Sequence, residues 1–330
     1  MPQKFALKQY LPNSSRLVYG CMGLGGNWQR LPLTDGDIKQ AHAVVETALE
    51  AGMTLFDHAD IYTHGNAEET FSHLFKQNPA LRSKMVLQTK CSIRFADEQH
   101  VGRYDQSKSY ILKAVDASLK RLGTEYIDIL LLHRPDALME PEEVALAFEQ
   151  LLKSGKVRHF GVSNMHSGQI KLLSRALEVP LIVNQLELSL LKHDWVDAGT
   201  TFNDDQSKTN RVLGDTIEHC RLENIQLQAW GSMANGLYTG AKIDSNRFND
   251  KQNAALLATK ELVTNLANLY GVGKEAIVLA WLLRHPAKIQ PVIGTVNLDR
   301  IKACAQALTL ELTREQWYQL YVTARGQALP

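Results

Sequence analysis

Four side chains with proton-transfer chemistry lie at, or shortly after, the ends of mainly apolar runs in this sequence. Asp57 closes the run 53–56, Lys90 closes 85–89, His133 closes 127–132, and Tyr62 follows Asp57 by five residues. Runs of this kind are typical of strands buried in a parallel sheet. Because the C-terminal ends of the strands in a parallel α/β barrel converge on one face, we expect these four residues to meet in one pocket.

The chemistry that such a set could perform is proton donation. A tyrosine hydroxyl is a weak acid with an ordinary pKa of about 10. A neighbouring Lys90 ammonium would favour the phenolate and lower the Tyr62 pKa, and Asp57 would hold Lys90 in place. His133 could orient the group that receives the proton. Since no side chain supplies a hydride, reduction of a carbonyl would require a nicotinamide cofactor.

Each of these residues also has an ordinary explanation when it is taken alone. Asp57 could cap a loop or helix, and Tyr62 could be a half-buried aromatic residue. Lys90 could be solvated, and His133 could be a hydrogen-bonded residue at a strand end. The meeting of all four on one face of a barrel is what favours an active site.

The elements that would position these residues alternate between strands and helices. Strands are expected at 17–20, 53–57, 85–90, 127–133, 157–162, 181–183, 225–230 and 291–293. Helical spacing of apolar residues separates them, with N-cap residues such as Thr34 and C-cap glycines such as Gly123. Eight strand–helix units predict a single-domain (β/α)8 TIM barrel over residues 1–330, with a doubly wound sheet as the alternative.

Several segments are expected to lie outside the barrel. Lys4–Tyr10 and Leu17–Gly20 flank the turn-like Pro12–Ser15, which predicts a short N-terminal hairpin. Additional C-terminal helices should follow the last strand, one of them from about Thr313. The polar segments 194–210 and 231–250 are predicted to be long loops.

Composition excludes several functional classes. The 330 residues include 36 basic and 35 acidic side chains, a net charge of +1, so a nucleic-acid partner is not expected. The four cysteines are too widely spaced for a structural metal site or a disulfide framework (Cys21, Cys91, Cys220 and Cys304). With no leader peptide and no run of roughly 20 apolar residues, a cytoplasmic protein without a membrane partner is expected. Nothing in the composition implies an oligomeric state.

Other strand ends carry groups suited to a dinucleotide. The glycine-rich segment Gly20–Gly26 would let a ligand approach the backbone, although it could equally be a turn. Ser163, Asn164 and Gln185 could bind a carboxamide or cap helices. Trp230 could stack on a flat ring or belong to the core.

A phosphate group could be bound near the last strand. Gly294 and Thr295 precede a helix that carries Arg300. A helix N-terminus with an arginine nearby is suited to a phosphate, although an arginine on a solvated face would have the same pattern.

Together these segments resemble the aldo-keto reductase superfamily. The resemblance rests on 56–57 with Tyr62, 132–135 (LHRP), 161–164 (GVSN) and 184–185 (NQ), in the family's order, and it extends from about Tyr19 to Ala307. The stretches 57–62 and 155–160 look closest to a bacterial branch, the YdhF-like oxidoreductases.

This resemblance implies a barrel that binds NADP (NADPH) in an extended pose and reduces an aldehyde or ketone, its small-molecule substrate, to an alcohol. Asp57, Tyr62, Lys90 and His133 match the family's catalytic tetrad, with Tyr62 as the general acid. The positions that match cofactor contacts are Gly20, Cys21, Met22, Ser163, Asn164, Gln185, Trp230, Gly231, Ser232, Met233, Gly236, Gly294, Thr295 and Arg300.

The sequence departs from the family pattern in three places. His58 replaces a small residue after the catalytic Asp, and Arg134 stands where many members have an aromatic residue, which predicts a more polar pocket. Near the 2′-phosphate, Gly294 stands in place of a Lys and Cys304 in place of an Asn.

Two other functions remain open. One is a cofactor-binding regulatory or redox-sensing subunit with little turnover, like the potassium-channel β subunits of the same family. The other is a barrel hydrolase, but such enzymes usually need two catalytic carboxylates or a metal ion, and the strand ends here have few acidic residues.

Overall fold

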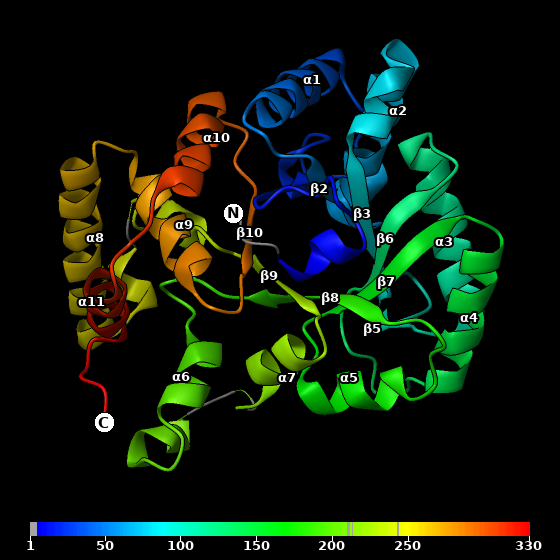
Figure 1. Cartoon of the computed structure of the whole chain (residues 1–330). Coiled ribbons are helices and arrows are strands. Elements are labelled where there is room, and N and C mark those ends of the chain that lie inside the picture. The colour runs from blue at the N-terminus through cyan, green and yellow to red at the C-terminus, as the bar shows by residue number, and fades with distance from the viewer. Residues whose placement is uncertain (1–4, 210–211, 213, 243) are drawn as a thin grey trace.

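Eight parallel strands close into a barrel in the computed structural model, which describes residues 5–209, 212, 214–242 and 244–330 (Figure 1). The strands are β1 (Val18–Gly20), β2 (Leu55–Asp57), β3 (Val86–Cys91), β6 (Ile127–Leu132), β7 (Val157–Ser163), β8 (Leu181–Glu187), β9 (Gln226–Trp230) and β10 (Gln290–Ile293). Their order around the barrel is β1-β10-β9-β8-β7-β6-β3-β2. Val18 of β1 pairs with Leu55 on one side and Val292 on the other, which closes the ring. The predicted barrel is confirmed.

Helices surround this barrel (Figure 1). They are α1 (Asp35–Glu50), α2 (Asn66–Gln77), α3 (Lys108–Leu122), α4 (Pro141–Lys153), α5 (Ser167–Ser174), α6 (Asp194–Thr200), α7 (Thr216–Leu222), α8 (Asp250–Tyr270), α9 (Lys274–Arg284), α10 (Leu298–Ala305) and α11 (Arg314–Arg325). The expected extra C-terminal helix is α11, which packs against α8. Among the described residues no single helix is long and apolar enough to cross a membrane. The consecutive pair α8 and α9 reaches that length and composition only together, across a 97° bend.

Capping residues begin and end helices where the sequence predicts. The Thr34 side chain accepts a hydrogen bond from the backbone N–H of Asp37 at the start of α1. Gly123 ends α3 with a left-handed backbone (φ 66°). A Cβ atom at Gly123 would lie 2.8 Å from Cβ of Ser72, so a side chain is excluded by space as well as by conformation.

The expected N-terminal hairpin is wrong. Residues Ala6–Gln9 form the short 3-10 helix η1 instead. Leu7 and Phe5 are buried against barrel residues such as Val183, so this segment closes the N-terminal end of the barrel. A hairpin partner is also excluded because both edges of β1 are already paired with barrel strands.

The expected polar loop over 194–210 is partly wrong as well. Its first half folds as α6, whose Val196 and Ala198 are buried, while Asn210 lies outside the described residues. The few apolar residues of this segment are enough to anchor one helical face although its overall composition is polar.

A two-stranded antiparallel hairpin projects from the C-terminal end of β3. It consists of β4 (Ile93–Arg94) and β5 (Arg103–Tyr104). Its strands pair only with each other and share no hydrogen bond with the barrel ladder.

Candidate active site

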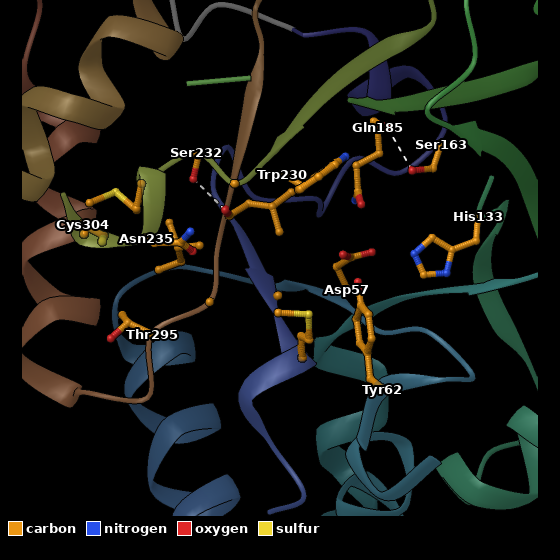
Figure 2. Close-up of a pocket in the computed structure, with 18 of the residues that line it drawn as sticks. Asp57, Tyr62, His133, Ser163, Gln185, Trp230, Ser232, Asn235, Thr295 and Cys304 are labelled. Carbon is orange, nitrogen blue, oxygen red and sulfur yellow. Dashed lines mark hydrogen bonds between the residues drawn. The ribbon is translucent and has the colours of Figure 1, made fainter. Parts of the chain in front are cut away.

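The four residues predicted to form a proton-donor site lie together at the C-terminal end of the barrel: Figure 2 shows Asp57, Tyr62 and His133, and Lys90 is hydrogen-bonded to Asp57 and Tyr62. Asp57 ends β2, Lys90 is the fifth residue of β3 and His133 follows β6. Tyr62 begins η3 (Tyr62–Gly65), the short helix after β2. The centroids of the Tyr62 and His133 rings are 6.0 Å apart.

The Lys90 ammonium uses all three of its N–H groups within this cluster. It donates to Asp57 Oδ2 at 2.7 Å, to the backbone oxygen of His58 at 2.8 Å and to Tyr62 Oη at 3.1 Å. Lys90 is fully buried, which excludes the solvated alternative. Because a Lys90 proton points at the Tyr62 oxygen, the hydroxyl proton of Tyr62 must point elsewhere, and Tyr62 lines a cavity.

Burial and charge set the protonation states of Lys90 and Tyr62. Burial disfavours the Lys90 ammonium, but Asp57 and Tyr62 more than offset this and hold the pKa of Lys90 above its ordinary value. Burial raises the pKa of Tyr62, and the Lys90 ammonium only partly opposes the rise. The expected net lowering of the Tyr62 pKa is therefore not observed, and Tyr62 stays a protonated phenol at neutral pH.

Both histidines beside Lys90 are neutral. Burial, then Lys90, then Arg134 hold the pKa of His133 well below its ordinary value. A neutral imidazole carries one N–H donor and one acceptor, so His133 can hydrogen-bond a ligand oxygen. Burial and then Lys90 lower the pKa of His58 to about 3, and its ring lies edge-on to Phe71 at 4.3 Å between centroids. The unusual His58 is thus accommodated as an uncharged core residue.

An elongated cavity of about 500 Å³ begins at the tetrad. Figure 2 shows it extending from Tyr62 and His133 past Trp230 to Thr295 and Cys304. The residues expected to contact a cofactor that line it are Gly20, Met22, Ser163, Asn164, Gln185, Trp230, Gly231, Ser232, Met233, Gly236, Gly294, Thr295 and Arg300. Cys21 lies apart from this set, because its thiol is buried and faces the backbone oxygen of Tyr19.

Polar side chains in the middle of the cavity are held rigidly. Asn164 donates to Ser163 Oγ at 2.8 Å and to the backbone oxygen of His133 at 3.2 Å. The Trp230 indole N–H donates to Asn164 Oδ1 at 3.0 Å, which fixes the ring plane. Gln185 points into the cavity beside them (Figure 2), and its Oε1 and one N–H have no partner among the described residues. These groups can bind a flat ring that carries a carboxamide.

Arg300 lies at the far end of the cavity on α10. The N-terminal turn of α10 is capped by Asn297, and Thr295 precedes it. Arg300 Nε is 3.6 Å from Glu275 Oε1, and 45% of the Arg300 side chain is exposed. A cation beside a helix N-terminus can bind a phosphate group, which would then compete with Glu275 for the guanidinium.

Sequence reasoning missed several residues that line the cavity. Ile61 and Ile93 form walls near the tetrad, and their proximity in sequence to Tyr62 and Lys90 was an available signal. The others at the walls are Trp28, Asn235, Thr239, Glu275, Val292 and Ile293. Glu275 reaches the cavity from α9, an outer helix, and no spacing pattern in the sequence indicates this.

The chain is similar to known proteins of one family over almost its whole length. The model of the Aldo/keto reductase family matches residues 16–321. The chain is 36% identical over 336 residues to the 6-dehydroglucose reductase of Agrobacterium fabrum, covering 98% of this chain and 99% of that one. It is 33% identical over 332 residues to the oxidoreductase YdhF of Escherichia coli, covering 100% of both. An aldo/keto reductase from Klebsiella pneumoniae, solved in complex with NADP and acetate, has a TM-score of 0.70 at 23% identity, covering 93% of this chain and 90% of that one.

Proposed function

The chain belongs to the aldo/keto reductase family, as its motifs predicted, and is an NAD(P)H-dependent oxidoreductase; from this premise we propose that it reduces an aldehyde or ketone to an alcohol with NADPH. The observation that carries the proposal is the hydrogen bond from Lys90 Nζ to Tyr62 Oη at 3.1 Å. It leaves the Tyr62 proton directed into the cavity, where a carbonyl oxygen can accept it.

Each tetrad residue has a role in this reaction. A bound nicotinamide supplies the hydride that adds to the carbonyl carbon. Tyr62 transfers its hydroxyl proton to the carbonyl oxygen, and the Lys90 ammonium stabilises the tyrosinate that remains. Asp57 holds Lys90, and neutral His133 donates a hydrogen bond to the carbonyl oxygen. Water then returns a proton to Tyr62.

The residues along the cavity fit a dinucleotide. Asn164 and Gln185 offer amide groups for the carboxamide, and Trp230 offers a flat face for the nicotinamide ring. Arg300 and the N-terminus of α10 lie at the opposite end, where a phosphate would lie. NADP in the Klebsiella pneumoniae relative supports the same choice of cofactor.

Oxidation of NADPH after addition of aldehydes and ketones tests the reaction directly. We expect turnover that requires both the carbonyl compound and NADPH. If NADPH binds but no aldehyde or ketone in a broad panel is reduced, the regulatory-subunit alternative is favoured instead.

We propose a preference for NADPH over NADH, and Arg300 provides its test. A charge-assisted hydrogen bond contributes about 1.5–3 kcal/mol, so Arg300→Ala should weaken NADPH binding roughly tenfold or more and leave NADH binding nearly unchanged. Lys302→Ala is the matched control, because Lys302 is an exposed cation on the same helix that does not line the cavity. Cofactor titrations monitored by fluorescence give the dissociation constants. Equal affinity of the wild type for both cofactors would refute the preference.

Arg134 points to the class of carbonyl substrate. It lines the cavity beside His133, with its guanidinium carbon 5.7 Å from the centroid of the Trp230 ring. Within the described residues this guanidinium makes no ion pair or hydrogen bond, so its N–H donors remain available. We infer that the substrate carries oxygen acceptors in addition to its carbonyl, as a sugar aldehyde does. The name of the Agrobacterium fabrum relative, 6-dehydroglucose reductase, agrees with such a substrate.

Arg134→Met should separate polar from apolar substrates. With a polyhydroxylated aldehyde we expect kcat/KM to fall about tenfold or more, mainly through KM, because uniform binding contacts are lost. With benzaldehyde, which offers no second oxygen, we expect a change below about twofold. Steady-state kinetics on both substrates provide the measurement, and Arg134→Lys should show an intermediate loss. An equal loss on both substrates would instead assign Arg134 a general structural role.

A further inference from the structure

A chain of buried glutamine side chains crosses the barrel directly beneath the tetrad. The members are Gln88 on β3, Gln185 on β8, Gln228 on β9 and Gln290 on β10, each 2% exposed or less. Gln88 Nε2 donates to Asp57 Oδ1 at 2.6 Å and to Gln228 Oε1 at 2.8 Å. Gln185 Nε2 donates to the same Gln228 oxygen at 2.9 Å. Gln228 Oε1 therefore connects Gln88, which donates to Asp57, with Gln185, which lines the cavity.

The orientation of every amide group in this glutamine chain is fixed by the partners at the two ends of the glutamine chain, Ser15 and Asp57. Gln290 Nε2 donates to the backbone oxygen of Ser15 at 2.7 Å, so Gln290 Oε1 faces Gln228 Nε2 at 3.4 Å. The oxygen of Gln228 must then face Gln88. At the other end the Asp57 carboxylate can only accept. If Gln88 were reversed, its oxygen would lie against the oxygens of Asp57 and Gln228, so only one orientation is possible. In this orientation Gln88 Oε1 is buried without a hydrogen-bond partner among the described residues.

The glutamine chain fixes the Asp57 carboxylate, and Asp57 in turn positions Lys90 beside Tyr62. Asp57 accepts from Lys90 through Oδ2 and from Gln88 through Oδ1, so rotation of the carboxylate would break both hydrogen bonds. The position of Lys90 depends on Asp57, and the hydroxyl direction of Tyr62 depends on Lys90. Gln88 is thus connected to Tyr62 through Asp57 and Lys90, and Gln88 does not line the cavity.

We propose that Gln88 is a positioning residue for the proton donor and that Gln228 couples it to the carboxamide-binding Gln185. This inference rests on the proposed function, in which Tyr62 is the general acid and Gln185 contacts the nicotinamide carboxamide. A cofactor that binds Gln185 also fixes the Gln185 amide group, which donates to Gln228. Because Gln228 also accepts from Gln88, cofactor binding becomes linked to the orientation of Tyr62.

Two buried glutamines on the barrel strands provide a matched comparison. Gln226 on β9 is as buried as Gln88, but its Nε2 donates to the backbone oxygens of Leu227 and Lys288, away from Asp57. We expect Gln88→Met to lower kcat about tenfold to a hundredfold, with the dissociation constant of NADPH changed less than about threefold. Gln226→Met should leave kcat within about twofold of the wild type. Equal kcat values in the two folded variants would overturn the proposal.

Gln88→Glu tests the hydrogen bond itself, including the case in which Gln88→Met fails to fold. The introduced carboxyl group has the shape of the amide, but it can donate to Asp57 only when it is protonated. When ionised, it repels Asp57. We expect the ratio of variant to wild-type kcat to rise about tenfold as the pH falls from about 8 to about 5.5. A ratio independent of pH would show that Gln88 only fills space.

Gln228→Met tests the coupling. It keeps the bond between Gln88 and Asp57 but releases Gln185, so we expect weaker NADPH binding together with a smaller loss of kcat than in Gln88→Met. The double variant should lose less than the product of the two single effects, because both act through one network. Independent, multiplicative effects would exclude the link. If Tyr62→Phe loses activity while Gln88→Met does not, only this proposal fails. If Tyr62→Phe retains activity, the assignment of Tyr62 as general acid fails, and the positioning role of Gln88 fails with it. If the wild type reduces no aldehyde or ketone, the proposed function itself fails.

Discussion

Replacement of Tyr62 by Phe should lower kcat for carbonyl reduction roughly 10²- to 10⁴-fold while NADPH still binds, because loss of a positioned general acid has effects of this size. The Tyr62 hydroxyl accepts a hydrogen bond from Lys90, and Tyr62 lines the cavity. Phenylalanine keeps the ring but has no proton to give. Steady-state turnover together with cofactor titration separates the lost chemistry from lost binding.

Tyr270→Phe is the matched control for this experiment. The Tyr270 hydroxyl donates to Gln316 Oε1 at 2.6 Å, between α8 and α11 and far from the tetrad in sequence. Its removal should leave kcat unchanged. Turnover of Tyr62→Phe close to that of the wild type would remove Tyr62 from the role of general acid.

Replacement of Lys90 by Met should nearly abolish reduction and also destabilise the fold. Sequence reasoning expects little structural effect from a lysine at a strand end, but Lys90 is fully buried and pairs with Asp57, which is only 2% exposed. Removing one partner of a buried ion pair leaves an unpaired charge, which costs about 3–5 kcal/mol. We therefore expect a lower melting temperature together with a loss of kcat of at least about 10²-fold.

The double variant Lys90→Met with Asp57→Asn separates these two effects. It removes both charges, so much of the stability should return while the activity stays low, because Tyr62 has lost the cation that stabilises its tyrosinate. Thermal unfolding and turnover are measured on the same preparations. Recovery of turnover along with stability would show that Lys90 serves only the fold.

The barrel and the tetrad were predictable because both depend on short-range patterns. An apolar run that ends in a polar residue marks a strand and its C-terminal end, and parallel closure then brings Asp57, Lys90 and His133 together. The packing of η1 across the barrel end was not predictable, since it depends on a contact between Leu7 and strands distant in sequence. Nor was the net rise of the Tyr62 pKa, because desolvation depends on the full depth of burial.

The glutamine chain was predictable from the sequence only in part. Gln88 precedes Lys90 by two residues and Gln228 precedes Trp230 by two. Side chains two residues apart in a strand share a face, so both glutamines could have been assigned to the barrel interior. Which atoms of Gln88 and Gln228 meet depends on strand register, and a single sequence does not encode that in any local pattern.

The hairpin of β4 and β5 forms part of the cavity wall, and its sequence can change without disturbing the barrel. Ile93 lines the cavity from this hairpin, yet its strand pairing is satisfied by Tyr104 within the same hairpin. Insertions or replacements between Arg94 and Arg103 therefore leave the hydrogen-bond ladder of the barrel intact. In evolutionary terms, selection for a different substrate can act on this segment while Asp57, Tyr62, Lys90 and His133 stay unchanged.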